Sequence, residues 1–444
     1  MELTKLIETM RNSGIVGCGG AGFPSYAKLN KSADTVILNC AECEPLLKLH
    51  RQVMEKYAYE IMSALEAVAS AIEADNIIIA IKPSYEGAVN AIKANLSSFA
   101  NIRIGLLPEV YPAGDEVVAI YETTGRVVPP GSIPIAVGCV VYNVETMLNA
   151  YNAIFLGRPV TEKYVTVCGE VKEPVTLKVP IGTSFRELVE LAGGATAKDV
   201  TYICGGPMMG SIVTIDSVVT KTTSDVIVIP EHSYVVQHRR ANIKLQFGRA
   251  KSVCCDCFVC TDLCPRHLLG HPIDPAAFMA AGLSFRTENT KPFLGTLYCC
   301  GCGICEMYAC EQGLSPRTLI GECKTNLRKH GVAMAEQVTL APVSRQRSHR
   351  MISKERLTAR LGLSKYDVAA PLSETEVRPD RLKLMLSQHI GAPCQPLVKE
   401  GDAVKAGEVI AKTPETSLGS VLHAPADGKI ESVTDKYILL KTDR

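Results

Sequence analysis

The sequence contains no tryptophan, and aromatic residues make up only 5% of its 444 residues. An aromatic platform on which nucleic-acid bases stack is therefore not expected. An excess of one charge is also missing, because 47 Lys and Arg residues face 46 Asp and Glu residues. A chain with this balance has no overall field that would draw it onto nucleic acid or an anionic membrane.

Long hydrophobic runs are absent as well. The apolar stretch 133–141 contains Pro134 and Gly138 and falls far short of the roughly 20 residues of a membrane helix. The first residues lack the basic segment followed by an apolar segment that marks a signal peptide. We therefore expect a protein without a membrane span that is located in the cytoplasm.

Cysteine, in contrast, is abundant and clustered. Ten of the 18 cysteines lie between Cys254 and Cys310. A disulfide framework would need an oxidising compartment, for which the sequence carries no export signal. Clustered cysteines in a reducing compartment indicate metal ligands.

Two cysteine runs have the spacing of a bacterial two-cluster ferredoxin. In each run three cysteines are separated by two residues; a fourth follows after three residues and precedes Pro265 in the first run, and follows after four residues in the second. In this fold the fourth cysteine of a run binds the cluster of the other run. We therefore predict two 4Fe–4S clusters. The ligands would be Cys254, Cys257, Cys260 and Cys310 for the first cluster, and Cys299, Cys302, Cys305 and Cys264 for the second.

Alternatives to this ligand set remain. Two structural zinc sites would also use four thiolates each, but zinc ribbons use two separated cysteine pairs and not three cysteines in a row. Cys300 is an alternative to Cys310, because the last gap of the second run is one residue longer than usual. Cys255 is expected to be inert, and His267 and His271 to be ordinary packing or surface residues.

The first 155 residues alternate between predicted helices and short buried strands. Helical periodicity covers 2–12, 52–73 and 85–96, and apolar runs predict strands at 35–39 and 76–81. Such alternation predicts a layered α/β domain.

A glycine loop follows the first predicted helix. Gly17, Gly19 and Gly22 have the spacing of a dinucleotide-binding loop, and Glu42 lies 20 residues further on. The loop follows a helix and not a strand, so a standard βαβ dinucleotide site is not expected. Glycines still let a phosphate or a flat ring approach the backbone closely. The loop therefore predicts a nucleotide or flavin site.

Four segments in this region resemble the flavin-binding subunit of respiratory complex I and the RnfC component of the Rnf complex. They are 17–24 with Lys28, 39–45, 111–116 and 142–146. Together with the later modules, the chain resembles the cobalamin reductases of propanediol-utilisation microcompartments.

This resemblance implies non-covalent FMN that is reduced by NADH. Asn39 would bind the flavin ring edge, Asn143 and Thr146 the ribityl phosphate, and Phe23 the nicotinamide or adenine, while residues 114–116 would line the nucleotide side. Glu42 and Glu44 match the family, with ordinary solvated carboxylates as the alternative. The implied cofactor-binding residues are Gly17, Gly19, Gly20, Phe23, Lys28, Asn39, Glu42, Glu44, Gly114, Asp115, Glu116, Asn143 and Thr146.

The rest of the chain predicts smaller domains. Strands at 164–169, 175–179, 212–214 and 226–229 with a helix at 184–192 indicate a small α+β domain. The end of the chain resembles a biotinyl or lipoyl carrier domain, but it has no lysine between Thr413 and Asp427, which excludes carrier chemistry. In the RnfC component this module precedes the flavin domain, whereas here it comes last.

We therefore predict a multidomain α/β and α+β protein. Its parts are an FMN- and NADH-binding α/β domain at 1–158, a β-grasp domain of the soluble-ligand-binding type at 159–235, a two-cluster ferredoxin-like domain at 245–330, a linker at 331–378 and a barrel-sandwich hybrid at 379–444.

The predicted function is NADH-dependent electron transfer through FMN and two 4Fe–4S clusters to a corrinoid. The sequence has no D-x-H-x-x-G cobalamin motif, so this acceptor rests on the resemblance. The alternatives are an RnfC-like component that serves ferredoxin, a glycyl-radical enzyme or an amino-acid reductase, and a docking module with incidental redox centres. Expected partners are a corrinoid or corrinoid-carrying enzyme, a microcompartment shell and an adenosyltransferase. The interior of a microcompartment is then the place expected within the cytoplasm.

Overall fold

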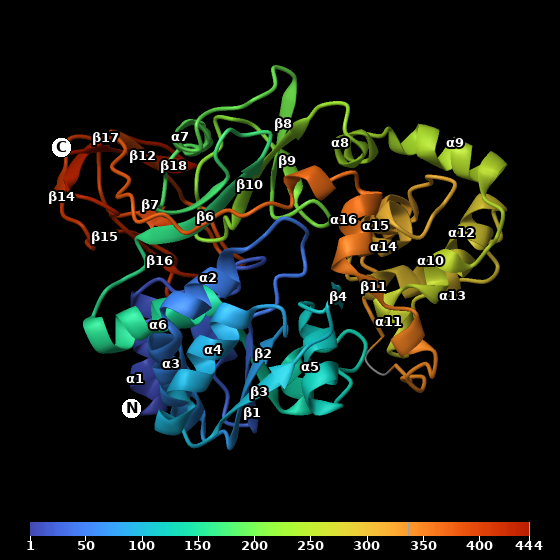
Figure 1. The fold of residues 1–444 in the computed structure, drawn as a ribbon, viewed down its shortest axis with the longest axis horizontal. Coiled ribbons are helices and arrows are strands. Elements are labelled where there is room, and N and C mark those ends of the chain that lie inside the picture. Colours follow the sequence, from blue (N-terminus) through green and yellow to red (C-terminus); the bar gives the residue numbers. More distant parts are fainter. Residues whose placement is uncertain (336–337, 444) are drawn as a thin grey trace.

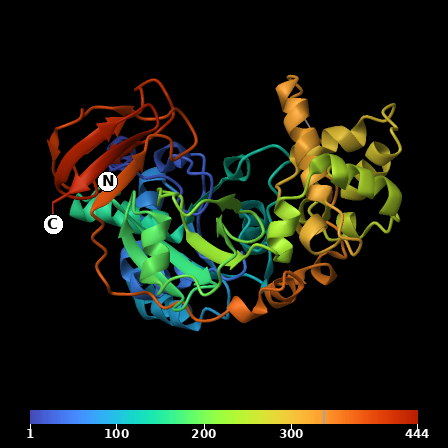
Figure 2. The same cartoon turned by 90° about the horizontal axis from the view of Figure 1, so that it is seen from above.

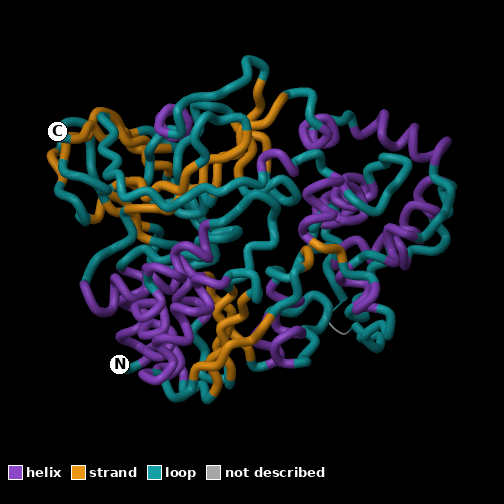
Figure 3. The backbone as a smooth tube through the Cα atoms, viewed as in Figure 1, coloured by secondary structure: helices purple, strands orange, loops and turns teal. Residues whose placement is uncertain are grey.

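The computed structural model describes residues 1–335 and 338–443. The cysteine-rich region lies at one end of the molecule and the C-terminal β domain at the other, with the first two domains between them (Figures 1 and 2). Helices dominate the cysteine-rich end and strands the opposite end (Figure 3). None of the described helices has the length and apolar character needed to cross a bilayer.

The N-terminal domain is built on a parallel sheet in the order β3-β2-β1-β5. Val36 and Leu38 belong to the core on one face of the sheet, and Ile37 belongs to the core on the other face, which includes the buried side of α5. Strands buried on both faces are expected to be almost continuously apolar, as these are. The elements are α1 Leu3–Asn12, β1 Thr35–Asn39, α2 Leu49–Lys56, α3 Ala58–Ile72, β2 Asn76–Ile81, α4 Glu86–Asn95, β3 Ile102–Leu106, β4 Val110–Tyr111, α5 Glu116–Thr124, β5 Cys139–Asn143 and α6 Val144–Leu156.

The helix predicted over 52–73 is wrong as one element, because the structure divides it into α2 and α3. Tyr57 separates the two helices with φ −126° and ψ 37°. Its ring packs against Tyr164 of the second domain at 6.4 Å between centroids, and the two hydroxyl oxygens are 3.3 Å apart. The break lies where the first domain contacts the second.

The second domain is a five-stranded mixed sheet in the order β7-β6-β10-β8-β9. The four predicted strands and the helix are confirmed, and Ser184 and Glu187 form a capping box at the start of that helix. β8 was not predicted. The elements are β6 Glu162–Gly169, β7 Val175–Pro180, α7 Phe185–Leu191, β8 Val200–Cys204, β9 Ser211–Val213 and β10 Asp225–Pro230.

The cysteine-rich region consists of short helices joined by loops that carry the cysteines. The elements are α8 Tyr234–Arg239, α9 Ile243–Val253, α10 Val259–Asp262, α11 Pro265–Leu268, α12 Pro275–Leu283, α13 Lys291–Gly295, α14 Ile304–Met307 and α15 Pro316–Lys329. The 3-10 turns of the chain are η1 Ser25–Lys28, η2 Leu96–Ser98, η3 Pro134–Val137, η4 Thr296–Tyr298, η5 Arg347–His349 and η6 Ser364–Tyr366.

The predicted linker 331–378 is partly folded, and residues 336 and 337 within it lie outside the described part. It contains β11 Ile352–Ser353 and α16 Lys354–Arg360. β11 pairs antiparallel with β4 of the first domain. Leu357 of α16 is buried in one apolar cluster with Met208 of the second domain and Ile304 of the cysteine-rich region. This segment therefore packs where three parts of the chain meet.

The C-terminal domain consists of two facing sets of short strands, in the orders β12-β18-β17-β14 and β13-β15-β16. This all-β architecture confirms the prediction for the end of the chain. The strands are β12 Arg381–Met385, β13 Gln395–Pro396, β14 Ala403–Val404, β15 Val409–Lys412, β16 Val421–His423, β17 Gly428–Val433 and β18 Tyr437–Thr442.

A buried ion pair joins the first two domains. Lys163 at the start of β6 contacts Glu145 in the first turn of α6, and their side chains are 0% and 1% exposed. Glu145 also accepts a hydrogen bond from the Tyr164 backbone N–H at 3.0 Å. A charge this deeply buried is tolerated only with its partner in place.

Replacing Lys163 by Met is expected to lower the free energy of unfolding by about 3–5 kcal/mol, because Glu145 would stay buried without its cation. Thermal unfolding by calorimetry measures the change. Lys31→Met is the matched control, since the Lys31–Glu73 pair is 55% and 68% exposed and should contribute no more than about 1 kcal/mol. Equal effects of the two substitutions would contradict the role given to the buried pair.

Candidate functional site

The glycine loop projects from the N-terminal domain beside the start of α6. The Gly17 N–H donates to the Phe23 carbonyl at 2.9 Å, and Val16 pairs with Pro24, so both ends of the loop are fixed. Gly19 and Gly20 at its tip are exposed, and the Phe23 side chain is half-buried. The loop therefore offers bare backbone to a ligand at a defined place.

Asn143 and Thr146 lie directly under this loop. The Asn143 side-chain oxygen caps α6 by accepting from the N–H groups of Glu145 and Thr146 at 2.9 and 3.2 Å. The Thr146 hydroxyl accepts from the Cys18 N–H at 3.1 Å. A Cβ added at Gly19 would lie 2.4 Å from Asn143 Nδ2. The loop can approach α6 this closely only because position 19 is glycine.

Glu42 is engaged at the start of α2. Its carboxylate oxygens accept from the Leu49 and His50 N–H groups at 3.0 and 2.8 Å. His50 Nε2 in turn lies 2.7 Å from Asn143 Nδ2, and burial lowers the pKa of His50, which favours the neutral ring as acceptor. Glu42 thus positions the residue that contacts Asn143, and the structure gives its carboxylate an internal role.

Asn39 and Gly114 meet at the carboxyl end of β1. Asn39 Nδ2 donates to the Gly114 carbonyl at 2.7 Å, while its oxygen accepts from the Ala41 N–H at 3.1 Å. A Cβ at Gly114 would lie 2.2 Å from the Ala41 carbonyl oxygen. The structure therefore brings together two of the predicted residues from segments 75 positions apart, at the sheet edge where ligands of parallel α/β domains bind.

Asp115 connects this edge to the cysteine-rich region. It caps α5 by accepting from the Val117 and Val118 N–H groups at 3.0 and 3.2 Å. Its two oxygens also accept from the Arg266 guanidinium at 2.7 and 2.9 Å. Arg266 follows Cys264 by two residues and was not singled out in the sequence. Only the adjacent Cys-Pro motif could have drawn attention to it.

Lys28 and Glu116 are close enough to influence each other. Lys28 Nζ donates to the Val141 carbonyl at 2.9 Å. Burial lowers the pKa of Lys28, and the nearby Glu116 carboxylate opposes this shift. Glu116 itself is exposed in the first turn of α5. These two side chains add one positive and one negative charge to the same edge.

Glu44 contacts the second domain. Its oxygens accept from the Met208 and Met209 N–H groups at 2.8 and 2.9 Å, and burial raises the pKa of Glu44 to about 7. Of the predicted cofactor residues, Glu44 is thus the one whose polar contacts lie in the neighbouring domain.

The cysteines predicted to bind the second cluster surround one small pocket. It is lined by Cys264, Cys299, Cys302 and Cys305, with Cys300 beside them and Arg266 and Arg317 among the other lining residues. Cys264 comes from the first run and the others from the second, as the crossed ligand pattern requires. Cys300 is not a ligand in this assignment. Its pKa is lowered to about 7 mainly by the neighbouring Cys302 thiol.

The cysteines predicted for the first cluster also lie near one another. Burial raises the pKa of Cys260 to about 12, and the nearby thiolates of Cys257, Cys310 and Cys254 contribute to the same shift. Cys310 thus lies near cysteines of the first run. Among the described residues, no three metal-binding side chains converge closely enough to share a single ion. The four thiolates of a cubane each bind a different iron atom and so surround a space.

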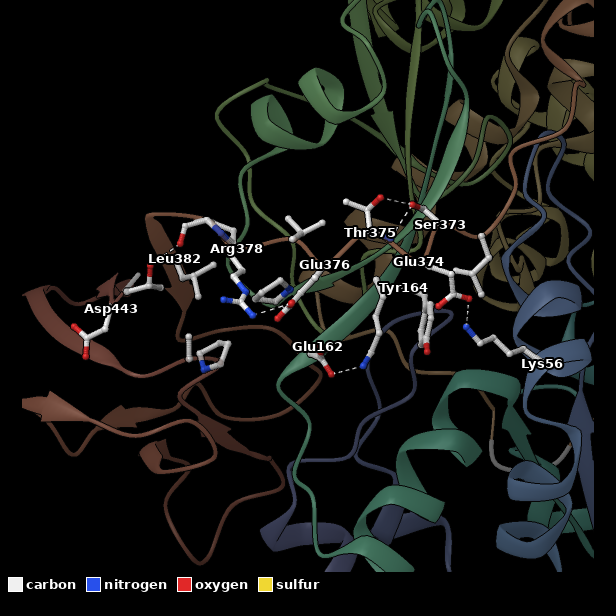
Figure 4. Close-up of a pocket in the computed structure, with 18 of the residues that line it drawn as sticks. Lys56, Glu162, Tyr164, Ser373, Glu374, Thr375, Glu376, Arg378, Leu382 and Asp443 are labelled. Carbon is white, nitrogen blue, oxygen red and sulfur yellow. Dashed lines mark hydrogen bonds and ion pairs between the residues drawn. The ribbon is translucent and has the colours of Figure 1, made fainter.

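A larger cavity of about 830 Å³ lies elsewhere, between the second domain, the C-terminal domain and the segment 372–379. Ion pairs such as Lys56–Glu374 and Arg378–Glu376 lie along its walls (Figure 4). It is lined by none of the residues predicted to bind FMN, NADH or the clusters.

Four protein-family models match successive parts of the chain. They are the Nuo51 FMN-binding domain at 10–152, the SLBB domain at 164–211, the 4Fe-4S dicluster domain at 253–315 and the RnfC barrel sandwich hybrid domain at 366–443. The predicted fold class is thereby confirmed, and the last match begins inside the predicted linker. The fold and its two kinds of site define a flavo-iron–sulfur oxidoreductase.

Relatives of nearly the same length narrow this class to a family. The chain is 41% identical to cobalamin reductase PduS of Citrobacter freundii, over 97% of this chain and 95% of that protein. It is 39% identical to cobalamin reductase PduS of Salmonella typhimurium, over 99% and 96%. The chain belongs to the cobalamin reductase PduS family, which confirms the predicted resemblance. It is also 29% identical to the RnfC-type component of the Na(+)-translocating ferredoxin:NAD(+) oxidoreductase complex of Acetobacterium woodii, over 66% and 64%.

The contact between Gly19 and Asn143 gives a direct test of the loop. Gly19→Ala is expected to lower the thermal stability of the FMN-free protein, because the new Cβ would displace Asn143 or the loop. Gly20→Ala is the matched control, since a Cβ there meets nothing within 4 Å. Calorimetry of the two FMN-free variants would contradict this geometry if both unfolded at the temperature of the unmodified protein.

Proposed function

We propose that this protein passes electrons from NADH through FMN and two 4Fe–4S clusters to a corrinoid, as a reductase of cob(III)alamin and cob(II)alamin. The observation that carries the proposal is the near full-length identity of 41% to a protein named cobalamin reductase. The match to FMN-binding and 4Fe-4S dicluster domains supports the redox groups.

The residues at the edge of the N-terminal domain fit a flavin. The position of Gly19 against Asn143 leaves exposed backbone at Gly19 and Gly20 and no side chain that would compete with a ring. In the proposal the glycines and Asn39 hold FMN, Lys28 and Thr146 contribute to its binding, and residues 114–116 face the nucleotide. FMN would supply the acceptance of a hydride and its release as single electrons, and the clusters would supply one-electron transfer.

The protein's own part in this transfer is to hold two sites at a fixed separation. The Asp115–Arg266 pair joins the edge that carries the proposed flavin residues to the loop that carries Cys264. The hydroxyl of Tyr111, four residues before Asp115, donates to the Cys302 carbonyl at 2.7 Å. These contacts support a direct path from the flavin domain to the second cluster.

A second candidate acceptor is ferredoxin or another protein partner, as for an RnfC-like component. The 29% identity to the Acetobacterium woodii protein over 66% of this chain favours it. A microcompartment location with shell or adenosyltransferase partners belongs to the first proposal.

An anaerobic titration of the reconstituted protein with NADH, followed by addition of cob(III)alamin, tests the proposal. NADH should bleach the flavin absorption and produce reduced-cluster EPR signals, and the corrinoid should then be reduced. Reduction of flavin and clusters without a change in the corrinoid would favour the second acceptor. Absence of flavin bleaching in protein that holds FMN would contradict NADH as the donor.

Neighbouring cysteines allow a matched test of the ligand set. Cys257→Ser should lower the iron content from about eight to about four atoms per chain, because one cubane loses a ligand. Cys255→Ser should leave it at about eight, although Cys255 is exposed in the same loop. Iron analysis and EPR of the reduced proteins provide the measurement. Equal iron loss in both variants would rule out the assigned spacing.

A further inference from the structure

Three basic side chains without an ion-pair partner among the described residues gather near the carboxyl end of β2. Lys82 directly follows β2, is fully buried, and its Nζ has no hydrogen-bond partner among those residues. The Arg51 guanidinium lies 4.0 Å from the centre of the Tyr85 ring, and its Nε also lacks a partner there. Lys354 is the first residue of α16. We refer to Arg51, Lys82 and Lys354 as the basic cluster.

Backbone contacts tie the three positions together. The Tyr85 N–H donates to the Lys82 carbonyl at 3.2 Å, which places the ring under Arg51 in the same turn as Lys82. The Lys354 N–H donates to the Glu109 carbonyl at 3.2 Å, and the Glu109 carboxylate accepts from the Ser84 N–H at 3.0 Å. The start of α16 is thereby attached to the edge that carries Lys82.

The carboxylates near the cluster are engaged elsewhere. Glu42 accepts from two N–H groups of α2, and Asp367 pairs with Lys48 at 2.9 Å. Within residues 1–335 and 338–443, no ion pair includes Arg51, Lys82 or Lys354. Burial lowers the pKa of Lys354 to about 8, and the charges of Arg51 and Lys82 lower it further. The cations therefore act on one another without a compensating anion.

An unpaired buried cation costs free energy, and an anionic ligand removes that cost. The cluster lies at the carboxyl edge of a parallel sheet, where such domains bind their ligands. We propose that the basic cluster binds the pyrophosphate of the pyridine dinucleotide. This inference rests on the proposed function, in which NADH is the electron donor.

The sheet order separates this site from the one proposed for the FMN phosphate. Asn143 ends β5, whereas Lys82 follows β2, and β1 lies between these strands. Two steps between neighbouring strands correspond to about 10 Å. The two ends of the edge can therefore hold the phosphate of FMN and the pyrophosphate of the dinucleotide separately. The proposal also gives the folded part of the predicted linker a function, because α16 supplies Lys354.

Binding of ADP-ribose to the FMN-loaded protein, measured by calorimetry, tests the site without any redox reaction. Lys354→Met is expected to raise the Kd for ADP-ribose by about tenfold or more, because a charge-assisted contact is lost. Arg356→Met is the matched control, since Arg356 is exposed on the same helix. Lys82→Met should weaken binding without lowering the thermal stability, since it removes an unpaired buried charge. If Lys82→Met does not fold, Lys354→Met decides.

The outcomes separate this inference from the proposal on which it rests. If the unmodified protein binds neither ADP-ribose nor NADH, the dinucleotide donor is wrong. If it binds both and Lys354→Met binds ADP-ribose as tightly as Arg356→Met, the inference is overturned and the donor stands. If Lys354→Met instead loses FMN while its affinity for ADP-ribose is unchanged, the cluster holds the FMN phosphate and the inference is again overturned.

Discussion

The bidentate ion pair between Asp115 and Arg266 determines how the N-terminal domain meets the cysteine-rich region. Both side chains are mostly buried, at 17% and 10% exposed, and the same carboxylate caps α5. A bidentate pair fixes orientation as well as distance. Transfer between centres in separate domains needs such a fixed separation, because its rate falls steeply with distance. The edge residues and the cysteine pocket can therefore act as one site only while this border holds.

The other borders follow the same principle, with a buried charge satisfied across each. Lys163 is paired with Glu145, and Glu44 holds two N–H groups of the second domain. Lys221 of the second domain donates to the Gly14 carbonyl at 2.7 Å and to the Val421 carbonyl at 2.6 Å. Because a buried charge that loses its partner is strongly destabilising, these contacts oppose separation of the domains. The chain is thus built as a rigid carrier of redox groups.

Local patterns predicted much of the fold and less of the site. The strands at 35–39 and 76–81 match β1 and β2 to the residue, since strands buried on both faces are apolar throughout. The break at Tyr57 was not predictable, because it accompanies a contact with Tyr164, which is far away in the sequence. Glu42 and Glu44 lie in one motif yet serve a helix start and a domain border. Only tertiary structure distinguishes these roles, and the polar composition of the segment around α16 concealed its contribution to the edge in the same way.

The position of the C-terminal domain explains how its place along the chain can differ between relatives. Although it comes last, it packs against the beginning of the first domain: the Arg11 side chain donates to the Glu415 carbonyl at 3.0 Å. A Cβ at Gly22 would meet the Cα of His389 at 2.9 Å, so this domain also borders the glycine loop. A module that contacts the start of the flavin domain could be joined to either end of the chain and keep the same neighbours. What such proteins must preserve is therefore the contact with the loop and not the order of the domains.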